Sequence, residues 1–356
     1  MQMKRGEILV EDYNIGIVFL RIWMCFEVIL VHYWSVHDIK NMPWYFLPFE
    51  STKMLAVPVF MIISFYLVEK DFIACDLQRI KKRFKRLVIP HCVCVGGGYF
   101  LLFSITDFII GTNWIENGFS DLFRQILTGT VSCLCPQLWY LEVLIILTAL
   151  FFFLFYYFPK DIAIFVIYVL GLGAIYIQYN GINYNLFGGF SSDIKYFAGR
   201  ISEMLPFAGI GFGMAYYKVG LWKRKSSVKI VLGAFLMLGL LYSVELFSEL
   251  PVGFAYQGAF YIMVAPLIVI IFMMLPLERI PMALKKAIIS VSKYCFGIFC
   301  IHWAVGKYFN FWLENQGLEV NTFKECLLIM VVSLLGSFII TKISENVKFL
   351  LSLAGK

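Results

Sequence analysis

Three ionisable residues interrupt the first apolar run of the sequence, Gly16 to Trp34. They are Arg21, Glu27 and His32, and each is costly in hydrocarbon, so each is a candidate for function. Arg21 and His32 are eleven residues apart, which on a helix places them on one face, about 16 Å apart along the axis. Glu27 is turned roughly 140° away from His32. The spacing therefore predicts a permanent cation on the same helical stripe as a titratable imidazole.

This stripe has two interpretations. In the first, Arg21 extends its guanidinium to the lipid headgroups and His32 is a hydrogen-bonded packing residue. In the second, the imidazole takes part in chemistry, because histidine exchanges a proton close to neutral pH. The shared helical face favours the second interpretation.

The composition excludes a soluble globular protein. Of the 356 residues, 61% are hydrophobic and only 15% are charged, with a mean hydropathy of +0.81. This balance is typical of a polytopic membrane protein. The net charge of +7 does not indicate a nucleic-acid partner, because the basic residues follow the membrane topology described below. The 9 cysteines show no zinc or redox spacing, so we expect no metal site.

The hydropathy pattern predicts an all-α fold, a bundle of about ten transmembrane helices in a single domain over 1–356. The first run is too long for a cleavable signal and stays in the membrane. An even number of spans places both termini on one side. The segments on that side hold most of the 30 lysine and arginine residues, so both termini are expected in the cytoplasm. The expected spans are 15–34, 53–69, 87–110, 137–158, 161–179, 198–217, 228–247, 256–276, 288–312 and 325–352.

The cytoplasmic segment between the second and third spans is unusually basic. It includes Arg83 and Arg86, which are three residues apart and would share a helical face. One interpretation is topological charge that touches anionic lipid. The other is a site for a phosphate-rich ligand, because arginine pairs phosphate through its planar fork.

Six motifs follow one another in chain order. They are Arg21 with His32, Val57 to Leu67 with Ser64, Arg83-x-x-Arg86 before Pro90, Leu138 to Leu141, Arg200-x-x-Glu203 before Gly209 and Gly211, and Phe296 to His302. Together they resemble the motifs of the acyltransferase-3 family, which are ten-helix membrane proteins that O-acylate sugars and other exported acceptors. Phe65 stands where that family usually has glycine, and Phe299 replaces a common tyrosine. The appended esterase-like domain of some members is absent from this sequence.

The resemblance implies a donor and a mechanism. The donor would be a cytoplasmic acyl-CoA, with acetyl-CoA the leading expectation, and its phosphates would bind Arg21, Arg83 and Arg86. An alcohol is a poor nucleophile until its proton is removed. His32 would therefore deprotonate the acceptor hydroxyl, or briefly carry the acyl group itself.

The resemblance also indicates residues for a carbohydrate acceptor. Glu142 would orient His32 or bind a sugar, while Trp139 and Tyr140 would stack on a sugar ring or simply anchor the span at the interface. His302 is a second proton-handling candidate. The remaining substrate-binding candidates are Ser64, and Arg200 with Glu203, for which a mutual ion pair is the leading interpretation. His37 and His91 lie at span ends, where we expect them to be wetted and incidental.

The resemblance implies the cytoplasmic membrane of a bacterium, with the lipid bilayer, acyl-CoA and a carbohydrate as partners and no nucleic acid. One alternative is a transporter or flippase of a glycan or lipid-linked substrate, for which repeated halves with broken spans are typical, and the sequence shows no such symmetry. A signalling or scaffold protein would leave the charges of Arg21, His32 and Arg200 unexplained.

Overall fold

The computed structural model describes residues 14–34, 52–115, 118–128, 135–179, 192–219, 233, 259–275, 280–318 and 322–345. Within these ranges the chain is helical and forms no β-strand, which confirms the predicted all-α class for them. The longer helices are α1 (Ile15–Trp34), α3 (Ala56–Tyr66), α5 (Leu77–Cys92), α6 (Leu101–Ile110), α8 (Trp139–Tyr157), α9 (Lys160–Tyr179), α11 (Ser192–Tyr216), α13 (Ala259–Met274), α15 (Cys295–Asn315) and α16 (Phe323–Ser344). The remaining elements are η3 (Lys53–Leu55), α4 (Glu69–Ile73), η4 (Val93–Phe100), α7 (Phe119–Thr128), η5 (Pro136–Leu138) and α14 (Met282–Ser292).

The described residues contain 5 helices that are long and apolar enough to cross a membrane. They are Ile15–Tyr33, Leu77–Ile110, Pro136–Tyr157, Lys160–Ile177 and Phe323–Ser344. A sixth span results if α14 and α15, which are bent by 53° at their junction, count as one. Ala56–Tyr66 and Tyr261–Met274 are shorter apolar helices. The count of ten and the cytoplasmic termini stay predictions, and apart from residue 233 the expected span 228–247 lies outside the described residues.

The basic segment before the third expected span belongs to the same continuous helical rod as the span itself. Asp76 begins this rod, since its carboxylate accepts hydrogen bonds from the backbone N–H groups of Gln78 and Arg79. Pro90, which lacks a backbone N–H, lies inside α5 without ending it. The eight residues that follow α5 form η4, which is π-helical. This geometry is rare and occurs often at functional sites. The arginines of α5 are therefore fixed rigidly to a membrane helix.

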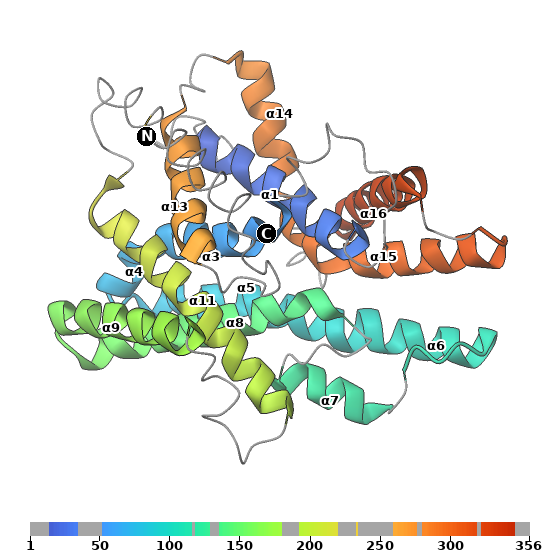
Figure 1. Ribbon diagram of the computed structural model, residues 1–356, viewed down its shortest axis with the longest axis horizontal. Helices are drawn as coiled ribbons and strands as arrows, with labels where there is room; N and C mark the ends of the chain where they lie inside the picture. The colour runs from blue at the N-terminus through green and yellow to red at the C-terminus, as the bar shows by residue number, and fades with distance from the viewer. Residues whose placement is uncertain are drawn as a thin grey trace, which may run out of the picture.

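α1 is surrounded by helices from distant parts of the chain. It packs against α3, α13, α14, α15 and α16, and Figure 1 shows it passing from α13 toward α15. Its start lies so close to α13 that a Cβ atom on Gly16 would collide with the carbonyl of Phe272. This close approach holds α1 in register with its neighbours.

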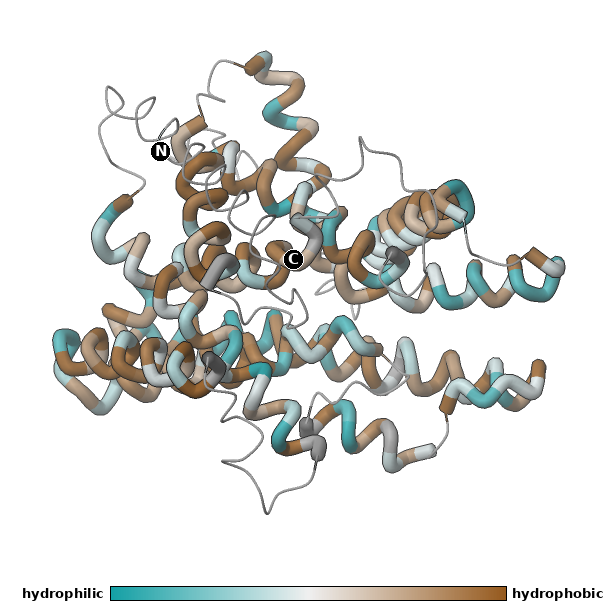
Figure 2. The backbone as a smooth tube through the Cα atoms, viewed as in Figure 1, coloured by the Kyte–Doolittle hydropathy of each residue, from teal (hydrophilic) through white to brown (hydrophobic). Residues whose placement is uncertain are grey.

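Apolar side chains also cover the outside of the bundle. Figure 2 shows hydrophobic residues over most of α13 and along α9 and α16. On α9, Phe165 and Leu172 are exposed, and on α16 the same holds for Leu335, Ile339 and Ile343. Exposed apolar faces of this kind suit a lipid environment, because lipid chains form no hydrogen bonds and a surface that faces them needs no polar groups.

Candidate active site

A cavity of about 360 Å³ opens between α1, α3, α5, α8 and α15. Three arginines line it, Arg21 from α1 and both Arg83 and Arg86 from α5. A neighbouring cavity of about 460 Å³ is lined by the same three arginines. Cavities of this size accommodate small-molecule ligands. The structure therefore brings together the three residues that the sequence assigned to one phosphate-rich ligand.

The guanidinium of Arg83 is held in place by hydroxyl groups. Its Nη2 donates to Ser64 Oγ at 2.8 Å, and its Nε donates to Thr148 Oγ1 at 3.2 Å. It also lies over the ring of Phe65, 5.7 Å from the centroid, which is within cation–π range. Ser64 and Thr148 belong to α3 and α8, so Arg83 links three helices at the cavity wall.

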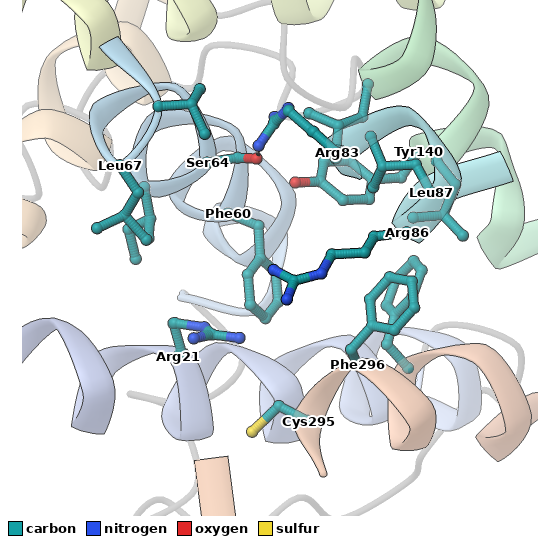
Figure 3. Close-up of a pocket in the computed structure, with 15 residues that line it drawn as sticks. Arg21, Phe60, Ser64, Leu67, Arg83, Arg86, Leu87, Tyr140, Cys295 and Phe296 are labelled. Carbon is teal, nitrogen blue, oxygen red and sulfur yellow. Dashed lines mark hydrogen bonds between the residues drawn. The ribbon is translucent and has the colours of Figure 1, made fainter. Parts of the chain in front are cut away.

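Arg86 lines the same cavity and has no ion-pair partner in the part of the chain that the structure describes. Figure 3 shows its guanidinium beside Phe60, reaching across toward the side from which Arg21 projects. Among the described residues, no ion pair joins Arg21, Arg83 or Arg86 to a carboxylate. The lining of the 360 Å³ cavity contains no acidic side chain, whereas Asp71 lines the neighbouring one. The arrangement suits an anion with several charges, because arginine binds phosphate through paired N–H groups.

Aromatic rings line the cavity beside the arginines. The ring centroid of Tyr140 lies 6.4 Å from that of Phe60 and 5.7 Å from that of Phe299. All three rings line the cavity, whereas His32 and His302 do not. Phe299 also contacts His302, at 6.2 Å between centroids. Phe299 is therefore a residue of the cavity lining that also contacts the histidine of α15.

Beyond Phe299 two histidines meet. The imidazole of His32 lies 5.2 Å from that of His302 and 5.4 Å from the indole ring of Trp303, measured between centroids. His302 is fully buried and His32 partly so. Arg21 lines the cavity together with residues of α15, and His32 contacts two rings of α15. Both residues therefore face α15 at two levels of α1, which agrees with the predicted stripe. The sequence did not predict that the two histidines would be neighbours.

Tyr33 fixes the two helices that carry the histidines. Its hydroxyl donates to the backbone carbonyl of His302 at 2.8 Å, and Ser333 of α16 donates to the same carbonyl at 2.7 Å. The ring of Tyr33 stacks on that of Trp303, with the centroids 6.1 Å apart and an angle of 20° between the planes. The histidine pair therefore sits on a rigid support.

The comparison with known proteins gives one match that covers most of the chain. The model of the acyltransferase-3 family, described as an acyltransferase domain, matches residues 14–342. The chain belongs to the acyltransferase-3 family. No curated protein and no solved structure matched it. This family membership makes the protein a membrane acyltransferase, and the cavity and histidine pair lie within the matched residues.

In this acyltransferase-3 protein, Glu142 belongs to a different group from His32. Its Oε1 lies 3.2 Å from Nε2 of His91 and accepts a hydrogen bond from Gln125 at 3.4 Å. His91 is buried, so the expectation that it is wetted was wrong. The reason is that α5 continues into η4 and carries His91 into the bundle. A role for Glu142 in catalysis stays a prediction, with no contact to His32 among the described residues.

Two acceptor candidates of α11 bind each other. Arg200 Nη1 lies 2.7 Å from Glu203 Oε2, which confirms the expected ion pair. The guanidinium of Arg200 also lies 4.8 Å from the ring centroid of Trp139. Tyr140, next to Trp139, lines the arginine cavity instead. The candidates assigned to an acceptor are therefore divided between two places, and their sugar-binding role stays a prediction.

Three residues of the acyltransferase site were missed or undervalued from the sequence. Thr148 lies within a long apolar run, where a lone hydroxyl was a weak signal. Phe299 was noted only as a departure from the family pattern. Trp303 directly follows His302, and its indole N–H in the middle of a span was a signal that could have found it.

Proposed function

We propose that this acyltransferase takes its acyl group from a cytoplasmic acyl-CoA, acetyl-CoA first, and transfers it to a hydroxyl of an exported or cell-surface carbohydrate. The observation that carries the proposal is the convergence of Arg21, Arg83 and Arg86 on one cavity whose lining includes Phe299, and Phe299 contacts His302. In the predicted orientation, the arginines face the cytoplasm and the histidines lie nearer the outer side.

The donor suits this arrangement because its charge and its reactive group lie at opposite ends. The phosphates of coenzyme A need cations, and the three guanidinium groups of the cavity have no carboxylate partner in the described part of the chain. The pantetheine arm is thin and mostly neutral, so it can extend along the cavity between aromatic rings. Binding of this kind would bring the thioester to the wall formed by Phe299.

His32 has the chemistry that transfer to a hydroxyl requires. A neutral imidazole can take the hydroxyl proton as the oxygen attacks the thioester carbonyl, and can return it to the leaving thiolate. It can also accept the acyl group on nitrogen and pass it on in a second step. Both routes need the thioester to pass Phe299, so we expect this side chain to move when the donor binds.

The test compares three strains: one without the gene, one with the wild-type gene restored and one with His32→Ala restored at equal protein level in the membrane. Mass spectrometry of surface and secreted glycans would show a base-labile ester only in the wild-type strain. An ester that persists in the His32→Ala strain would remove His32 from the mechanism. Glycans with no ester in any strain would overturn the carbohydrate acceptor.

The same experiment separates this function from transport. A transporter or flippase moves its glycan without covalent change, so deletion of the gene would alter where the glycan is found and leave its mass unchanged. The family match to an acyltransferase domain does not favour that alternative.

A further inference from the structure

The hydrogen bonds of His302 fix which of its nitrogens carries the proton. Its Nδ1 lies 2.8 Å from the carbonyl oxygen of Phe299 and 3.1 Å from that of Ile298. A carbonyl oxygen can only accept, so in the neutral imidazole Nδ1 bears the hydrogen. Nε2 is then left with a lone pair and no hydrogen.

Two buried polar atoms on the rings that contact His32 have no hydrogen-bond partner among the described residues. They are Nε2 of His302, an acceptor, and Nε1 of Trp303, which can only donate. Buried groups of this kind are rare, because leaving them unpaired costs free energy, and each calls for an explanation. Beside the candidate base, the indole N–H can donate a hydrogen bond to a carbonyl oxygen, and the imidazole nitrogen can accept one from a hydroxyl.

The indole of Trp303 is held firmly in this position. Its ring contacts the imidazole of His32 edge to face, at 5.4 Å between centroids. On another side it stacks on Tyr33, whose hydroxyl donates to the carbonyl of His302. A donor that is fixed before the reaction stabilises developing charge without first having to reorganise.

We propose that Trp303 is a catalytic residue whose indole N–H binds the thioester carbonyl oxygen as that oxygen becomes negatively charged. This inference rests on the proposed function. The acceptor oxygen forms a bond to the carbonyl carbon, its proton passes to His32, and the carbonyl π pair moves onto the oxygen that Trp303 binds. When the carbonyl re-forms, the C–S bond breaks and the departing thiolate takes the proton from His32.

The experiment uses the full chain in membranes of a strain that lacks the gene, radiolabelled acetyl-CoA as the donor and the endogenous glycan as the acceptor. Trp303→Phe removes the N–H and keeps an aromatic ring. We expect the maximal rate per protein to fall by about 10²–10³-fold, as for other lost oxyanion donors, while the KM for acetyl-CoA stays the same. The matched control is Trp312→Phe on the same helix, because Trp312 is exposed and stacks only on Phe309 among the rings described.

A second variant separates the N–H from packing. Benzothienylalanine at position 303 has nearly the shape of tryptophan, with sulfur in place of the indole N–H, so it should fold like the wild type and lose the same rate. Full activity in this variant would overturn the role of Trp303 and leave the proposed function intact. A wild-type chain that transfers no label would overturn the proposed function, and this inference with it.

Discussion

The hydroxyl group of Tyr33 occupies the place that a Cβ atom on Gly306 would need. Only glycine fits at position 306 without displacing this tyrosine. Tyr33 follows His32 on α1, and Gly306 lies one turn beyond His302 on α15. The contact therefore sets how closely the two helices approach each other at the level of the histidine pair.

Gly306→Ala should move Tyr33 and disturb the histidine pair. The added methyl group overpacks a buried contact, which costs about 1–3 kcal/mol of stability, and we expect acyl transfer to fall further than stability does. The control is Gly173→Ala in α9, where an added Cβ would meet no atom within 4 Å. Thermal unfolding and transfer rate, measured on both variants, check this. Wild-type activity in Gly306→Ala would show that the approach of the helices is not critical.

Arg86→Gln should weaken donor binding with little effect on folding. Arg86 is exposed in the cavity and makes no ion pair in the described part of the chain. Loss of one charged contact to phosphate corresponds to about 1.5–3 kcal/mol, so the KM for acetyl-CoA should rise by about tenfold or more. Lys85→Gln, its exposed neighbour outside both cavity linings, is the control. Equal KM values in the two variants would argue against a phosphate contact at Arg86.

Arg83→Gln should lower stability as well as activity. Its guanidinium donates to Ser64 and Thr148 on two other helices, and hydrogen bonds to charged groups contribute about 1.5–3 kcal/mol. Arg79→Gln is the control, since Arg79 forms exposed ion pairs with Asp71 and Asp76 that are worth at most about 1 kcal/mol. The midpoint of thermal unfolding in detergent distinguishes the two. An equal shift in both would mean that the hydroxyl contacts of Arg83 carry little energy.

Glu142→Gln should reduce acyl transfer far less than His32→Ala does. The carboxylate of Glu142 faces His91 and Gln125, and the aromatic neighbours of His32 are His302 and Trp303. We expect a change in rate of less than about tenfold, which is 1.4 kcal/mol of barrier. The comparison uses the labelled acetyl-CoA assay at equal protein level. A loss as large as that of His32→Ala would restore the predicted catalytic role of Glu142.

Helical periodicity predicted the parts of the site that lie on one helix. The stripe of Arg21 and His32 follows from the 3.6-residue repeat, and so does the pair of Arg200 and Glu203, which meet at a spacing of three residues. The all-α class followed from apolar runs too long for strands. In each case the spacing along the sequence already decided which side chains share a face.

Contacts between distant helices could not be predicted in this way. His32 and His302 are separated by most of the chain, and no pattern within either span shows that they meet. His91 was misjudged because it lies near the start of the expected span 87–110, whereas the helix begins ten residues earlier, at Leu77, and carries His91 into the bundle. The wall formed by Phe299 depends on how α8 and α15 pack, which the sequence of neither helix reveals.

The hydroxyl groups of Ser64 and Thr148 hold the guanidinium of Arg83 in place. Because a hydroxyl group is uncharged, it leaves the positive charge of Arg83 in full, whereas a carboxylate would cancel it. Its field, with those of Arg21 and Arg86, therefore extends out of the cavity mouth and attracts polyanions before they touch the protein. Salt shortens the reach of such a field to about 8 Å at physiological ionic strength. Raising the ionic strength should therefore lower the association rate of the nucleotide donor. The turnover rate of the enzyme with the donor already bound should stay the same.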